Sequence, residues 1–122
     1  MIIVEGLRKG FAVNKTQGRS GTRIPCQIPV TLESMYPTDP FSEPCQVILV
    51  NLRGCAALFS RPLEIDRAVR LQGLTTTTQV TGRVVNCISL GDSEKRYLLG
   101  LALDEPGNVW GIRTPPEDWE HN

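Results

Sequence analysis

The chain has 122 residues, a length that suits one domain with one modest hydrophobic core. Hydrophobic residues make up 40% of it and charged residues 21%, values that exclude a chain disordered throughout. The formal net charge of zero argues against broad binding to the backbone of a nucleic acid polymer.

The N-terminal stretch, residues 1–16, contains glycines and shows no sustained hydrophobic period, so we expect a flexible segment there. Residues 1–25 carry five basic side chains and one acidic side chain, a local net charge of +4 that can attract a small anion. The apolar opening, Met1 to Val4, is interrupted by Glu5 and is too short for a secretory signal or a membrane span. We therefore expect a cytoplasmic protein without membrane insertion.

Six segments then have the pattern of β-strands, in which apolar side chains alternate with polar ones or form short buried runs. Polar or proline-rich turns separate them, and stretches with a helical period are almost absent. Pro29 lacks an amide hydrogen, which predicts a sheet edge or a local irregularity in the first strand. The pattern predicts an all-β fold, either a small antiparallel barrel or a sandwich. The expected strands are residues 25–32, 46–52, 55–59, 69–72, 77–88 and 97–103.

The last stretch, residues 106–122, is predicted to form an acidic C-terminal tail that starts with a short helical turn near Val109 and Trp110. Residues 104–122 carry five acidic side chains and one basic side chain, a local net charge of −4. Mutual attraction between this stretch and the basic start of the chain is an alternative to anion binding. Trp110 and Trp119 are expected to cap the open end of the core, because large aromatic side chains are mostly buried.

The cysteines and the histidine do not suggest a metal site. The four cysteines are widely spaced and the sole histidine is His121, so the clustered ligands of a zinc site are missing. Each cysteine lies in or beside an apolar run, which predicts buried, reduced thiols. Asp104 and Glu105 are adjacent at a strand end and should point apart. No nucleophile is paired with a base, so we expect neither an enzyme nor a resident cofactor.

Two arginines, Arg19 and Arg23, stand four residues apart just before the first expected strand, with Ser20, Gly21 and Thr22 between them. Guanidinium is a planar cation that grips phosphate, pairs with the acceptor edge of guanine and stacks on a base. Small residues between the two cations let the backbone adapt to a ligand. By spacing alone, such a pair is weak evidence of a site, because basic residues near the start of a chain are usually just solvated.

This arginine pair ahead of six short strands, with a polar turn at residues 51–54, resembles the PilZ domain family, bacterial small β-barrels that bind cyclic di-GMP. The resemblance covers residues 17–105, which would form the barrel domain. The family's first motif, Arg-x-x-x-Arg in the loop that enters the barrel, is matched by Arg19 and Arg23.

The family's second motif, Asp/Asn-x-Ser-x-x-Gly, is matched only in part, and two alignments are open. In the first, Gly54 takes the glycine position and Asn51 the serine position, which puts Leu49 where an acid or amide is usual. In the second, Asn51 comes first, with Arg53 at the serine position and Ala56 at the glycine position.

The resemblance implies a binding site for cyclic di-GMP with no further cofactor. In such a site, Arg19 and Arg23 would hold phosphate and stack on or hydrogen-bond guanine. Asn51 and Gly54 would meet a guanine, with Gly54 allowing close backbone approach. Arg53 lies beside this site and would contact phosphate.

The resemblance also implies a switch. Residues 5–24 would be mobile without ligand, and the ligand would order the arginine loop over the barrel and so change a face offered to a protein partner. Two alternatives remain. One is a PilZ-type adaptor that no longer binds nucleotide and acts through protein contacts. The other is an oligonucleotide-binding small barrel, which the low aromatic content of 6% disfavours.

Overall fold

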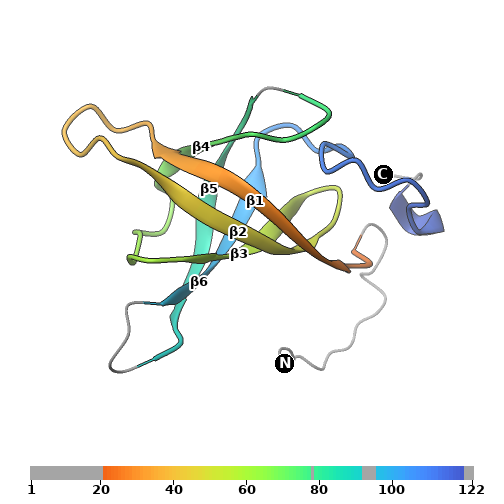
Figure 1. Cartoon of the computed structure of the whole chain (residues 1–122), viewed down its shortest axis with the longest axis horizontal. Coiled ribbons are helices and arrows are strands. Elements are labelled where there is room, and N and C mark those ends of the chain that lie inside the picture. Colours follow the sequence, from red (N-terminus) through yellow and green to blue (C-terminus); the bar gives the residue numbers. More distant parts are fainter. Residues whose placement is uncertain (1–20, 78, 92–95, 120–122) are drawn as a thin grey trace.

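The computed structural model describes residues 21–77, 79–91 and 96–119, and these form one closed β-barrel (Figure 1). Within the described residues there are six strands, each antiparallel to its neighbours, in the order β1-β2-β3-β6-β5-β4. The predicted all-β, six-stranded antiparallel barrel is therefore confirmed. The strands are β1 Ile24–Ser34, β2 Ser42–Val50, β3 Gly54–Phe59, β4 Ala68–Gln72, β5 Gln79–Ser89 and β6 Tyr97–Leu103.

Strand β1 closes the barrel unevenly. It pairs with β2 over most of its length, but with β4 only from Thr31 to Ser34. Pro29 lies before the pairing with β4 begins, so its missing amide hydrogen removes no ladder bond on that side. The register with β2 also shifts between Pro25 and Ile28. The predicted irregularity of this strand is confirmed.

Strand β2 begins and ends earlier than the sequence pattern predicts. It starts at Ser42 rather than Gln46 and includes Pro44, which was expected in the preceding loop. It ends at Val50, and Asn51 and Leu52 belong to the turn into β3 rather than to the strand. Proline is tolerated in a strand wherever the ladder does not use its amide, and the sequence alone does not reveal that position.

The core follows from alternation along the strands, interrupted on β2 by a register shift that leaves both Val47 and Val50 buried. On β6, Leu99 and Leu101 point inward and are nearly inaccessible, whereas Leu98, Gly100 and Ala102 are more exposed. The inward set from all six strands forms one apolar cluster, whose burial is the main stabilising term for a domain of this size. The largest fully buried side chains are Leu32, Leu99, Val47, Val50, Val69 and Val84.

Strand β6 passes very close to both of its neighbours. A Cβ added to Gly54 of β3 would overlap the carbonyl oxygen of Leu101, and one added to Gly82 of β5 would overlap that of Ala102. The backbones therefore approach so closely near the C-terminal end of β6 that glycine is required on both neighbouring strands.

The segment after β6 packs back onto the barrel instead of trailing away from it (Figure 1). Trp110 and Trp119 are 5% and 3% exposed, as the expected capping of the core requires. The helical element is a 3-10 turn at Glu117–Trp119, whereas Val109 and Trp110 form a non-helical turn. In the described part of the chain, no helix has the length and apolar character needed to cross a membrane.

Candidate functional site

A groove of about 430 Å³ lies on the outer face of strands β2, β3, β6 and β5. Its centre is lined by small side chains at facing positions: Ala56 pairs with Gly100, and Gly54 with Ala102. Because these outward positions carry so little side chain, the sheet surface is hollow there. A flat ring can therefore approach the backbone closely.

Aliphatic side chains border this hollow. Leu49 of β2 lies opposite Ala56 of β3. Ile88 of β5 lies opposite Leu98 of β6. Val85 is 52% exposed and Ile88 is 46% exposed, unusually high values for large apolar residues on a sheet. The far end of the groove is thus apolar, whereas the polar residue Asn86, opposite Gly100, also lines its middle.

The near end of the groove is cationic. Arg23 directly precedes β1, and the pairing of Ile24 with Val50 brings it beside the turn between β2 and β3. Arg23 and Arg53 both line the groove, and both are exposed. The Arg23 guanidinium makes no hydrogen bond or ion pair with residues 21–77, 79–91 or 96–119. Arg19, the other half of the predicted pair, lies outside the described residues, as does most of the segment predicted to be mobile.

Asn51 has a structural task that the sequence did not predict. Its side-chain Oδ1 accepts hydrogen bonds from the amides of Arg53 at 2.9 Å and Gly54 at 3.0 Å. Its own amide donates to the Gly54 carbonyl, and its carbonyl accepts from the Trp110 indole at 2.8 Å. Asn51 therefore shapes the turn that presents Arg53, and its acceptor oxygen is already engaged.

Four of the five predicted site residues thus meet at one place. Arg23 comes from the loop before β1, and Asn51, Arg53 and Gly54 come from the β2–β3 turn; all four line the groove. Gly54 is buried, and β6 explains why it is glycine. Whether it also approaches a ligand stays a prediction. The three defined positions of each alignment of the second motif line the groove, so the site does not depend on which alignment is chosen.

The cysteine thiols near this region are poor nucleophiles. Burial raises the pKa of Cys45 to about 12 and is also the main cause that raises the pKa of Cys26 and Cys55. Thiolate, the reactive and metal-binding form, is therefore scarce at neutral pH. Among the described residues, no group of three or more cysteine, histidine or acidic side chains is placed to hold a metal ion.

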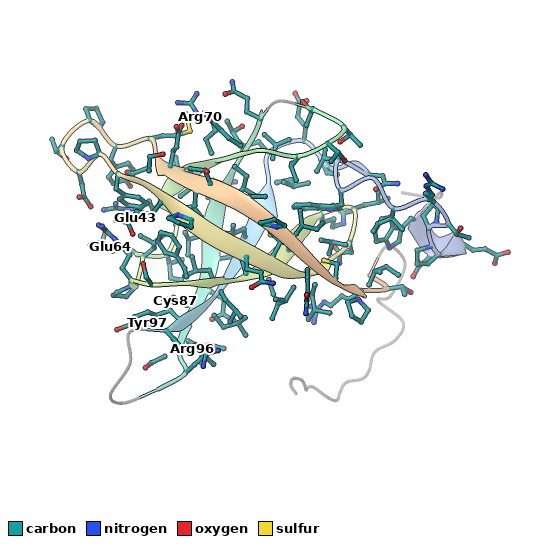
Figure 2. The ribbon with its side chains drawn as sticks, viewed as in Figure 1. Glu43, Glu64, Arg70, Cys87, Arg96 and Tyr97 are labelled. Atoms are coloured by element: carbon teal, nitrogen blue, oxygen red, sulfur yellow. The ribbon has the colours of Figure 1, made fainter. Side chains whose placement is uncertain are left out.

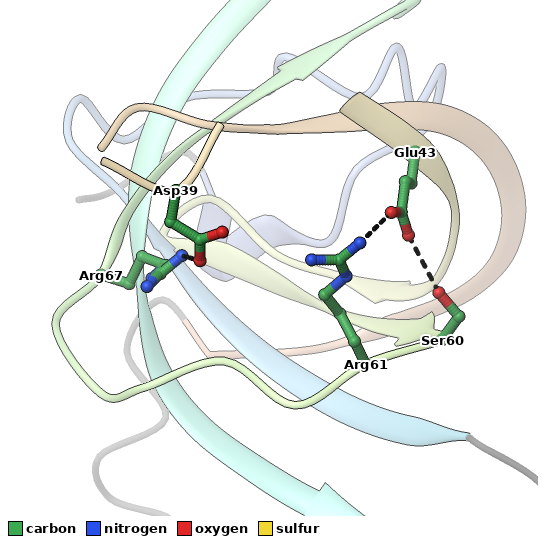
Figure 3. A network of polar contacts seen from close by, with 5 residues as sticks. All are labelled: Asp39, Glu43, Ser60, Arg61 and Arg67. Atoms are coloured by element: carbon green, nitrogen blue, oxygen red, sulfur yellow. Dashed lines mark hydrogen bonds and ion pairs between the residues drawn. The ribbon is translucent and has the colours of Figure 1, made fainter. Parts of the chain in front are cut away.

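A second, larger cleft lies at the opposite end of the barrel, and Glu43 and Glu64 both line it (Figure 2). Both arginines of this cleft are paired with carboxylates (Figure 3): Arg61 with Glu43, which also accepts from Ser60, and Arg67 with Asp39. The same arginines stack on aromatic rings, Arg61 on Phe41 and Arg67 on Tyr36. Arginines held by both a carboxylate and a ring are occupied in stabilising the loops.

The apolar part of the groove was missed in the sequence. Its signal was present in β6, where the outward positions Leu98, Gly100 and Ala102 are all uncharged, a pattern unusual for a sheet face in water. In comparisons with known proteins, no family model, no curated protein and no solved structure matches this chain.

Proposed function

We propose that this protein is a receptor for cyclic di-GMP that binds the dinucleotide in the groove on β2, β3, β6 and β5. The observation that carries the proposal is the shared location of Arg23, Asn51, Arg53 and Gly54 in one groove, from two separate segments of chain. The resemblance to the PilZ family supports this ligand. The protein would act in the cytoplasm as an adaptor whose partner-binding face changes when the ligand is bound.

The chemistry of the groove suits the two halves of such a ligand. Cyclic di-GMP carries two phosphate charges and two flat purines. The cationic end, with Arg23 and Arg53, would neutralise phosphate, and arginine does so with a planar fork of donors. The hollow formed by Ala56, Gly100 and Ala102 offers an apolar surface on which a purine face can lie.

Titration calorimetry with cyclic di-GMP tests the proposal. The native chain is expected to bind, and Arg23→Ala is expected to weaken binding at least tenfold, since a hydrogen bond to a charged group contributes about 1.5–3 kcal/mol. Arg113→Ala is the matched control, because Arg113 is an exposed arginine outside the groove lining. Equal affinity for the native chain and Arg23→Ala would exclude this groove as the site.

Ala56→Leu tests the hollow separately from the charge. Ala56 points outward between Leu49 and Gly100, so a larger side chain would fill the groove without entering the core. Binding is expected to be lost while the unfolding temperature stays close to that of the native chain. Retained affinity would show that the ligand does not lie on these small residues.

A second candidate function is a PilZ-type adaptor that has lost nucleotide binding. Two observations favour it: Leu49 borders the groove with an apolar side chain, and the Oδ1 atom of Asn51 is engaged by two backbone amides. A guanine would thus find fewer acceptors than in a site built around a free carboxylate. No binding heat from the folded native chain at high micromolar ligand would favour the adaptor.

A further inference from the structure

The loop that carries Arg23 is held by a turn almost a hundred residues away in the sequence. Thr22 lies between the two arginines of the motif, and three of its polar atoms bond to the 3-10 turn Glu117–Trp119. Its amide and its hydroxyl donate to Asp118 Oδ2 at 3.2 and 2.6 Å. Its carbonyl accepts from the Trp119 indole at 2.7 Å.

These contacts fix the backbone immediately before Arg23. A residue whose amide, carbonyl and hydroxyl are all bonded has little freedom in φ and ψ, and the next residue inherits that orientation. Trp119 is 3% exposed, so one side of the contact is anchored in the core. The direction in which Arg23 leaves the chain is therefore set from outside the arginine loop.

Only one of the two carboxylate oxygens of Asp118 is hydrogen-bonded within the described residues. Its Oδ2 takes both bonds from Thr22, while its Oδ1 is buried and has no hydrogen-bond partner in the part of the chain that the structure describes. A buried acceptor without a partner typically lowers the stability of the folded state. Such local conflicts are expected where a side chain serves a functional geometry rather than the fold alone.

We propose that Asp118 and Trp119 are positioning residues that hold the arginine loop at the mouth of the groove. They do not touch the ligand. They fix Thr22 and, through it, the backbone from which the Arg23 side chain extends at the cationic end of the groove. Their role in ligand affinity rests on the proposed function, whereas their role in holding the loop does not.

The first experiment needs no ligand. Amide hydrogen exchange at Thr22 is measured by NMR in the native chain and in three variants. Asp118→Ala is expected to speed exchange at least tenfold, because the acceptor of that amide is gone. Asp118→Asn keeps an acceptor oxygen and is expected to stay within about threefold of the native rate. Glu117→Ala removes the same charge from an exposed position of the same turn and is expected to change nothing. If Thr22 exchanged at the native rate in Asp118→Ala, the proposal that Asp118 holds the loop would be refuted.

The second experiment measures affinity for cyclic di-GMP by calorimetry on the same proteins. Asp118→Ala is expected to bind about tenfold more weakly, the effect of losing two hydrogen bonds of ordinary strength. Asp118→Asn should restore most of the affinity, which a loss of global stability alone would not explain. Trp119→Phe keeps a smaller aromatic ring but loses the indole donor, and should weaken binding even if Asp118→Ala fails to fold.

The outcomes separate the two proposals. If the native chain does not bind cyclic di-GMP, the receptor function is wrong. The exchange rates at Thr22 still decide whether Asp118 and Trp119 hold the loop. If the native chain binds and Asp118→Ala binds equally well despite faster exchange at Thr22, the positioning role is refuted.

Discussion

Gly54→Ala gives the sharpest test of how the barrel and the site are related. The added Cβ would overlap the carbonyl oxygen of Leu101, and would stand 3.0 Å from its carbonyl carbon and 3.2 Å from the Cα of Ala102. All three atoms belong to the backbone, so no side-chain rotation relieves the clash. Strands β3 and β6 must separate locally instead.

The size of the effect follows from this geometry. Overpacking costs about 1–3 kcal/mol, and each weakened ladder bond adds about 0.5–1.5 kcal/mol. The reduced backbone freedom of alanine in the unfolded chain offsets about 0.4–1 kcal/mol. A net loss of about 2–3 kcal/mol should lower the unfolding temperature by about 8–12 °C in a domain of this size.

Differential scanning calorimetry without ligand measures this shift. Gly107→Ala is the matched control, because a Cβ there meets nothing within 4 Å. It should stay within about 2 °C of the native chain, as surface substitutions away from special features usually do. If Gly54→Ala were as stable as Gly107→Ala, the close approach of β6 would not be the reason for this glycine. The interpretation of Gly54 as a ligand contact would then gain weight.

Three further predictions concern single residues. Asn51→Ala should lower the free energy of unfolding, measured in urea, by about 1–2 kcal/mol, because two turn amides lose their acceptor. Asn51→Asp keeps an acceptor oxygen and should lose less stability. Equal losses in the two variants would contradict the role of Asn51 in capping the turn. The raised pKa of Cys45 means that the unfolded thiol ionises before the folded one, so stability should be full below pH 9.0 and fall toward about pH 12. Urea unfolding at several pH values should show a slope that Cys45→Ala reduces by about 1.4 kcal/mol per pH unit, and an unchanged slope would refute this assignment. Asp66 has a φ of 73°, a left-handed backbone conformation that glycine adopts more easily than alanine does. In thermal unfolding, Asp66→Gly should therefore be more stable than Asp66→Ala by about 1 kcal/mol. The reverse order would contradict backbone strain at this residue.

The sequence predicted the sheet well because the strands signal themselves by alternation. Tyr97–Leu103 was predicted with its observed bounds, since every second residue faces the core. The start of β2 was missed because Pro44 and its neighbours read as a loop, although the ladder accepts a proline there. Its end was missed because Leu52 is buried in a turn, and burial in a turn looks like burial in a strand.

The candidate site was predicted only where its chemistry is carried by charged or polar residues. Arg23 and Arg53 stand out in the sequence, and the groove contains both. The hollow made by Ala56, Gly100 and Ala102 depends on which small residues face one another across β3 and β6, and that register is a property of the closed barrel. The contact of Thr22 with Asp118 links residues 96 positions apart, a distance at which local patterns carry no signal.

The segment after β6 also gives the molecule two built-in optical reporters. The indole of Trp110 donates to the carbonyl of Asn51, and the indole of Trp119 donates to the carbonyl of Thr22. One chromophore is thus tied to the β2–β3 turn, and the other to the residue that precedes Arg23. Tryptophan emission of variants that keep only one of the two indoles should therefore report, without any label, whether the turn or the loop moves when an anion arrives.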